Sequence, residues 1–132
     1  MKQMLQAIYS QYTSQDAAAD LRGLVSQFHF GQADSKKGLP VVVYNIIAGS
    51  TEYTINDDAE IDTQIVQFSI FAKTYINAMS IYDAINTAYQ NKALTYSTDT
   101  QLVCRREAMT GPEKMEDAYQ VTTDFLIMNY RS

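Results

Sequence analysis

The sequence predicts an α+β fold, with helices packed on one face of an antiparallel sheet and a long hairpin protruding beyond it. Apolar residues recur every three or four positions over 4–12 and 74–90, which indicates amphipathic helices. Apolar and polar residues alternate over 63–72 and 119–127, the period of a strand with one buried face. The order helix, helix, strands, helix, strands is typical of an α+β domain.

The N-terminal part of the chain is expected to form two helices and a short strand. The helix over 4–12 ends at a polar run, after which Ser14 or Asp16 can cap a second, short helix over 17–24. A short strand is expected within 25–30, where two phenylalanines lie two positions apart.

The middle of the chain predicts a long hairpin. A polar, glycine-containing loop over 32–39 precedes 41–48, whose β-branched residues indicate a strand. Residues typical of turns lie within 49–62, although 51–55 retains strand propensity. We therefore expect the hairpin to have its tip near Asp57 and to return through the alternating strand.

The second half of the chain predicts one long helix and further strands. The helix over 74–90 starts at a threonine that can cap it. Strands are expected at 94–96 and 101–109, an exposed loop or turn at 110–117, and a closing strand from 119. The faces of these elements predict a core of the following residues: Leu5, Ile8, Val43, Val66, Phe68, Ile70, Ile81, Ile85 and Phe125.

Length and cysteine content indicate one intracellular domain. The 132 residues, taken as one domain over 1–132, are enough to bury a core without disulfides or metal staples. Cys104 is the single cysteine and has no internal partner, which suits a reducing compartment. No stretch of about 20 apolar residues occurs, so we expect no membrane-spanning segment.

The charge balance disfavours specific binding to nucleic acids. Fifteen acidic and ten basic residues give a net charge of −5, whereas binding to phosphates needs clustered lysine and arginine. The basic clusters are Lys36-Lys37 and Arg105-Arg106, and both are too short to follow a nucleic-acid backbone.

Candidate catalytic residues are few. His29 is the only histidine, and a dyad with Cys104 has no supporting local motif. The glycines form no phosphate-binding pattern, and one cysteine and one histidine make no zinc motif. The acidic run 56–62 lacks the central glycine of a calcium-binding EF-hand loop, which favours a solvated hairpin tip. We therefore expect no enzyme activity, no metal and no cofactor.

The hairpin is the candidate functional surface, as an assembly interface. Tyr53 and Ile55 lie two positions apart, so on an extended strand they share one apolar face. An apolar face beyond the main core favours a partner. The acidic residues Asp57, Asp58 and Glu60 would set orientation more than affinity. The alternative is that the tyrosine and isoleucine fold back on their own sheet.

The arrangement of elements resembles the tail-completion, or tail-terminator, proteins of long-tailed bacteriophages and prophages. Two helices lead to Gly-Leu-Pro-Val-Val-Val-Tyr at 38–44, followed by Glu-Tyr-Thr-Ile at 52–55 in the hairpin. The alternating strand at 66–75 ends in Phe-Ala-Lys-Thr-Tyr and starts a helix, and a closing strand over 119–130 ends in an aromatic residue. The resemblance extends over about residues 3–130 and departs from the family pattern at Val41 and in the charged run at 105–107.

This resemblance implies a virion structural protein that forms a ring, expected to be a hexamer, at the head-proximal end of the tail tube. Such a ring would end tube polymerisation and provide the surface that docks to the head. Its expected partners are further copies of itself, the tail-tube protein and a head-completion protein, and its location is the virion, assembled in the host cytoplasm. The family has no catalytic residues to transfer. Two alternatives stay open, namely a small cytoplasmic ligand-binding α+β module with an apolar pocket between sheet and helix, and an enzyme that uses Cys104.

Overall fold

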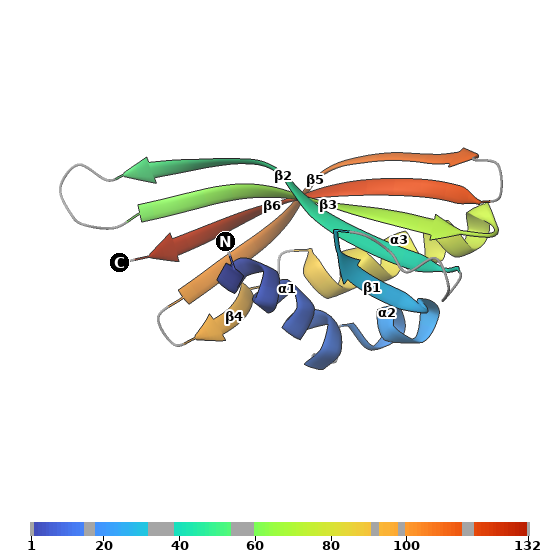
Figure 1. Ribbon diagram of the computed structural model, residues 1–132, viewed down its shortest axis with the longest axis horizontal. Helices are drawn as coiled ribbons and strands as arrows, with labels where there is room; N and C mark the ends of the chain where they lie inside the picture. The colour runs from blue at the N-terminus through green and yellow to red at the C-terminus, as the bar shows by residue number, and fades with distance from the viewer. Residues whose placement is uncertain are drawn as a thin grey trace.

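The computed structural model describes seven stretches of the chain: residues 2–14, 18–31, 39–53, 60–90, 93–97, 100–114 and 118–131. Within them the chain forms helices and strands in the following order (Figure 1): α1 (Lys2–Ser14), α2 (Ala19–Leu24), β1 (Gln27–Phe30), β2 (Val41–Tyr53), β3 (Glu60–Ala72), α3 (Tyr75–Tyr89), β4 (Ala93–Ser97), β5 (Thr100–Lys114) and β6 (Tyr119–Arg131).

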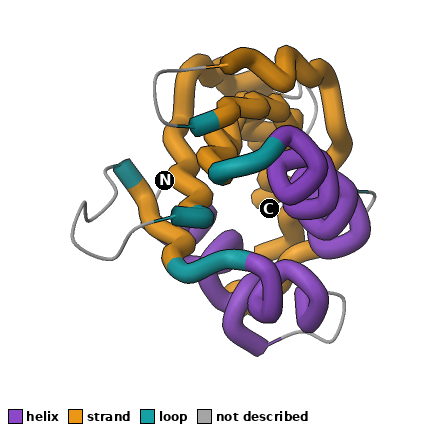
Figure 2. Tube along the Cα trace, turned by 90° about the vertical axis from the view of Figure 1, so that its right-hand side faces the viewer, coloured by secondary structure: helices purple, strands orange, loops and turns teal. Residues whose placement is uncertain are grey.

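The strands form one sheet in the order β1-β2-β3-β6-β5-β4, with the helices gathered on one side of it (Figures 1 and 2). The expected α+β class is confirmed. The sheet is mixed rather than wholly antiparallel, because β1 pairs with β2 in the parallel sense while the other pairs are antiparallel. Parallel pairing is possible here because β1 is short, so the segment between Phe30 and Val41 is long enough to return the chain.

Helix capping follows the expectation for α3 and differs from it for α2. The Thr74 hydroxyl accepts a hydrogen bond from the Asn77 backbone N–H at 3.2 Å, which satisfies one of the unpaired donors of the first turn. The cap of α2 is Ala18, and no side chain caps the helix. Ser14 is the last residue of α1, and Asp16 lies outside the described residues. The predicted cap of α2 was wrong because this helix begins at Ala19, later than expected.

The loop or turn expected over 110–117 is wrong for 110–114, because β5 continues to Lys114, while 115–117 lie outside the described residues. The ladder between β5 and β6 is interrupted by register shifts at Arg106/Ala108 and Thr110/Glu113. Gly111 lies in the second shift with φ +108°, a conformation that favours glycine. Glycine and proline therefore mark a bulge inside this strand rather than its end.

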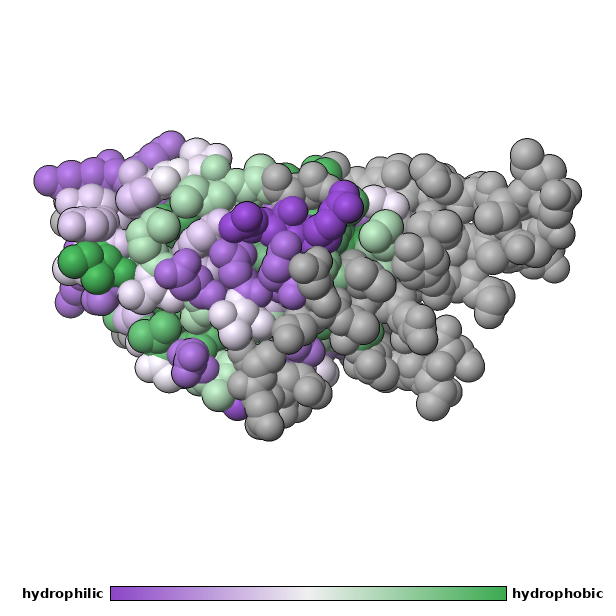
Figure 3. Space-filling model, turned by 180° about the vertical axis from the view of Figure 1, so that it is seen from behind, coloured by the Kyte–Doolittle hydropathy of each residue, from purple (hydrophilic) through white to green (hydrophobic). Residues whose placement is uncertain are grey.

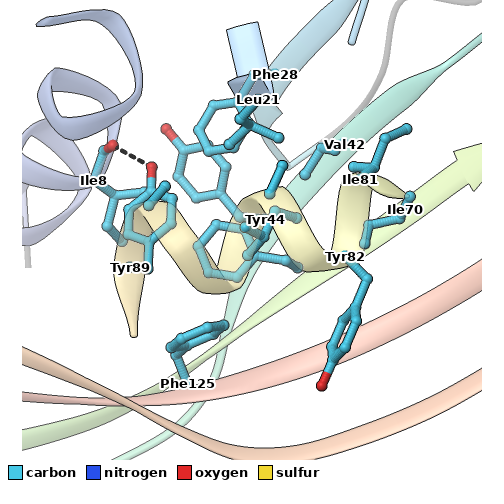
Figure 4. Close-up of a cluster of buried hydrophobic side chains, with 14 of the residues drawn as sticks. Ile8, Leu21, Phe28, Val42, Tyr44, Ile70, Ile81, Tyr82, Tyr89 and Phe125 are labelled. Carbon is cyan, nitrogen blue, oxygen red and sulfur yellow. Dashed lines mark hydrogen bonds between the residues drawn. The ribbon is translucent and has the colours of Figure 1, made fainter. Parts of the chain in front are cut away.

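The core lies between the sheet and the helices, where aromatic rings from strands and helices meet (Figure 4). Seven of the predicted core residues belong to this cluster: Ile8, Val66, Phe68, Ile70, Ile81, Ile85 and Phe125. Leu5 is partly buried against it. Val43 is buried but lies outside the cluster, because its neighbours Val42 and Tyr44 face the helices and successive side chains of a strand alternate.

Two hydrogen bonds join the first helix to the last one. The Tyr89 hydroxyl donates to the Ile8 carbonyl oxygen at 2.7 Å (Figure 4), and the Gln11 side-chain amide donates to the Ala88 carbonyl oxygen at 2.9 Å. These side chains are buried, so each bond satisfies a polar group that would otherwise be costly to remove from water. The N-terminal helix is thereby held on the same core as α3.

Candidate assembly surface

The long hairpin is formed by β2 and β3, which pair from Val41↔Phe71 to Tyr53↔Glu60. Its existence was predicted correctly, while the expected tip at 54–59 lies outside the described residues. The hairpin extends past the helices, but β6 runs beside β3 as far as Glu60↔Arg131 (Figure 1). The projecting part is therefore continuous with the rest of the sheet rather than an isolated arm, since Tyr130 of β6 also pairs with Gln101 of β5.

The predicted interface residues are only partly described. Tyr53 is the last residue of β2 and Glu60 the first of β3, and the register places them opposite each other. Ile55, Asp57 and Asp58 lie outside the described residues. The shared apolar face and the acidic tip thus stay predictions.

The structure shows exposed apolar residues that were not predicted as part of the interface. Phe30 at the end of β1 and Ile47 in β2 are 51% and 50% exposed. Ile47 lies at the register shift between Ile46 and Ala48, and this bulge exposes its side chain although the surrounding sequence is typical of a buried strand. A second exposed pair, Tyr75 and Ile76, starts α3. Seen from behind, the described surface carries separate apolar patches among polar ones (Figure 3).

The geometry separates the two residues of the candidate dyad. Cys104 belongs to the core cluster. His29 follows Phe28, which is in that cluster, so its side chain points to the opposite side of the sheet. Three strands, β2, β3 and β6, also lie between β1 and β5 in the sheet. Among the described residues no group of three or more His, Cys, Asp and Glu side chains could hold a metal ion.

Cys104 is expected to be unreactive in the folded protein. Burial raises the pKa of its thiol to about 12, so the nucleophilic thiolate is scarce at neutral pH. A thiol reagent at pH 8 should leave the folded chain unmodified and react quickly in denaturant, where the thiol is exposed and has its ordinary pKa. Equal rates in the two states, followed by absorbance of the released chromophore, would contradict this assignment.

Comparison with known proteins identifies a shared fold. No protein-family model matches the chain, and no curated protein matches its sequence. A chain of the solved structure "Virion of native gene transfer agent (GTA) particle" is similar in fold, with a TM-score of 0.71. The match covers 95% of this chain and 92% of that chain at 13% sequence identity.

None of the described helices is long and apolar enough to cross a membrane.

Proposed function

We propose that this chain is a structural protein of a phage-like virion and acts by assembling with other proteins. The observation that carries the proposal is the fold similarity to a chain of a gene transfer agent virion, which extends over nearly the whole length of both chains. The separation of Cys104 from His29, and the burial of the thiol, favour this role over catalysis. The space between sheet and helices holds core side chains, which favours assembly over binding of a small ligand there (Figure 4).

Within the virion, we propose the role of a tail terminator. The chain would form a hexameric ring at the head-proximal end of the tail tube, end tube polymerisation and present the head-docking surface. Its partners would be other copies of itself, the tail-tube protein and a head-completion protein. The resemblance of segments such as 38–44 and 66–75 to that family supports this role, and the hairpin extending past the helices provides a surface for it.

The hairpin interface is tested by replacing Tyr53 and Ile55 together with serine. We expect the circular dichroism and melting temperature to stay near those of the wild type, while ring formation and tail completion fail. Sedimentation velocity measures the ring, and electron microscopy measures the length of tubes polymerised with and without the protein. A matched control replaces Tyr9 and Leu24, which are 49% and 41% exposed on the helices, with serine and should assemble normally.

Three outcomes would contradict these proposals. If the serine double variant unfolds, the two side chains belong to the protein's own core; if it assembles normally, the hairpin is not the interface. If the wild-type chain neither forms a ring nor limits the length of tail tubes, the terminator role itself is wrong.

A further inference from the structure

Among the described residues, one edge of the sheet has no neighbouring strand along much of β2. β1 pairs only with the first four residues of β2, from Gln27↔Val41 to Phe30↔Tyr44. Beyond Tyr44, among the described residues, β2 pairs on its other side with β3 and has no strand on the side of β1. The helix α1 packs on β4 and on the other two helices rather than covering this edge. Figure 1 shows this part of β2 running along the border of the projecting sheet.

The register indicates which backbone groups face outward on this edge. The Gly31 N–H donates to the Tyr44 carbonyl oxygen at 3.1 Å, so the polar groups of Tyr44 point away from β3. The direction alternates along a strand, and the bulge between Ile46 and Ala48 shifts the alternation by one residue. The N–H and C=O groups of Gly49, Thr51 and Tyr53 therefore point to the open edge. Outward-pointing N–H and C=O groups on every second residue are what a neighbouring strand needs for pairing.

Among the described residues, the other free edges of the sheet are short or interrupted, whereas β2 continues from Ala48 to Tyr53 without a further register shift. On β5, the Arg106 backbone N–H donates a hydrogen bond to the Gln90 side-chain oxygen at 2.6 Å. Pro112 and two register shifts also interrupt this strand. Prolines and bulges of this kind prevent strand addition. The outer edge of β1 is only four residues long. At the other end of the sheet, α1 packs on β4. The segment from Ala48 to Tyr53 contains no proline, lysine or arginine.

The charge around this edge selects the kind of partner. On the described part of the hairpin beyond Tyr44, residues 45–53 and 60–67 include three acidic and no basic residues, so two copies of this edge would repel each other. Pairing with β5 of a second copy meets the protected edge described above. Phe30 at the end of β1 and Ile47, three residues beyond its partner Tyr44 on β2, are half-exposed and offer apolar contact to a chain that continues in line with β1.

We propose that the edge of β2 from Ala48 to Tyr53 binds an extended, basic segment of another virion protein, which adds a strand to the sheet. Backbone hydrogen bonds to Gly49, Thr51 and Tyr53 would provide the binding, and the acidic hairpin would select lysine or arginine in the partner. The inference rests on the proposed assembly role for its partner, and its site on the backbone edge of β2 adjoins the predicted contact between ring subunits at Tyr53.

The test uses a synthetic peptide of alternating lysine and valine and an otherwise identical peptide with glutamate in place of lysine. We expect the basic peptide to bind the wild-type chain, more weakly as salt increases, and the acidic peptide not to bind. Amide hydrogen exchange followed by NMR should slow at Thr51 and Tyr53 when the basic peptide is added, and should change little at Ser50, whose amide already faces β3.

A pair of proline variants separates strand addition from simple charge attraction. Thr51→Pro removes an outward N–H, so the fold should persist while affinity for the basic peptide falls about tenfold or more. Thr51→Val keeps the N–H and should bind as the wild type does. Ser50→Pro removes a hydrogen bond to β3 and should lower the melting temperature, which checks the assigned direction of the backbone groups.

Equal binding of the basic peptide to the proline and valine variants at position 51, or binding without slower exchange at Thr51 and Tyr53, would overturn the proposal. So would failure of the basic peptide to bind, or equal binding of both peptides. The exchange measurement uses the wild-type chain and stays informative even if Thr51→Pro does not fold. Because the peptide assay needs no ring or tail, a failure here is distinguishable from a failure of the terminator role.

Discussion

Replacing Phe68 with alanine is expected to lower the free energy of unfolding by about 3–5 kcal/mol, the range for a fully buried phenylalanine. Its side chain is 0% exposed and lies where strands and helix meet. The ring centroid is 5.1 Å from that of Tyr89 on α3, 5.5 Å from Phe125 on β6 and 5.9 Å from Tyr44 on β2. The substitution would remove apolar contact with three elements at once and leave a cavity among rigid rings.

Urea denaturation measures this loss, and Phe30→Ala serves as a control. Phe30 is also an aromatic strand residue in contact with Tyr44, at 5.8 Å between ring centroids, but it is 51% exposed. Its truncation should cost about 1 kcal/mol or less, because it removes little buried surface. Similar losses for the two variants would show that the space around Phe68 collapses to fill the cavity, or that the core is centred elsewhere.

The faces of the strands could be predicted from the sequence because one side of the sheet is buried. Val66, Phe68 and Ile70 alternate with polar residues, and a shift by one residue would turn all of them toward water. The same reasoning placed Phe125 correctly on β6. Val43 is buried as predicted, but its segment has apolar residues on both faces, so alternation could not show that it lies on the side of the sheet away from the core cluster.

The direction of β1 and the length of β5 could not be predicted by local reasoning. Whether β1 pairs in the parallel or the antiparallel direction depends on which sheet edge is available to this short strand, and only tertiary contacts determine this. At 110–114 the glycine and proline are typical of a turn, but pairing with β6 continues around them through a bulge. The candidate surface was predicted only in part for the same reason, because an open edge on β2 is a property of what its neighbours leave uncovered.

Gly111→Ala is expected to be more damaging than alanine at Gly23 or Gly31. At φ +108° an L side chain is strained, which alone costs about 1–3 kcal/mol. An added Cβ would also lie 2.6 Å from the Gln120 carbonyl oxygen and 3.3 Å from the Val121 Cα. Both atoms belong to the backbone of β6, so relief requires the β5–β6 ladder to move rather than a side chain to rotate.

Gly31→Ala is the matched control, because it separates backbone strain from the close approach of β6. Gly31 also has a positive φ, +89°, but a Cβ there meets no atom of the described residues within 4 Å. Both variants lose conformational freedom in the unfolded chain to a similar extent, so that contribution cancels in the comparison. We therefore expect Gly111→Ala to lower the free energy of unfolding clearly more than Gly31→Ala, measured by urea denaturation. Equal losses would mean that the ladder yields to the added Cβ at little cost, and that the bulge at Thr110/Glu113 is a compliant part of the sheet.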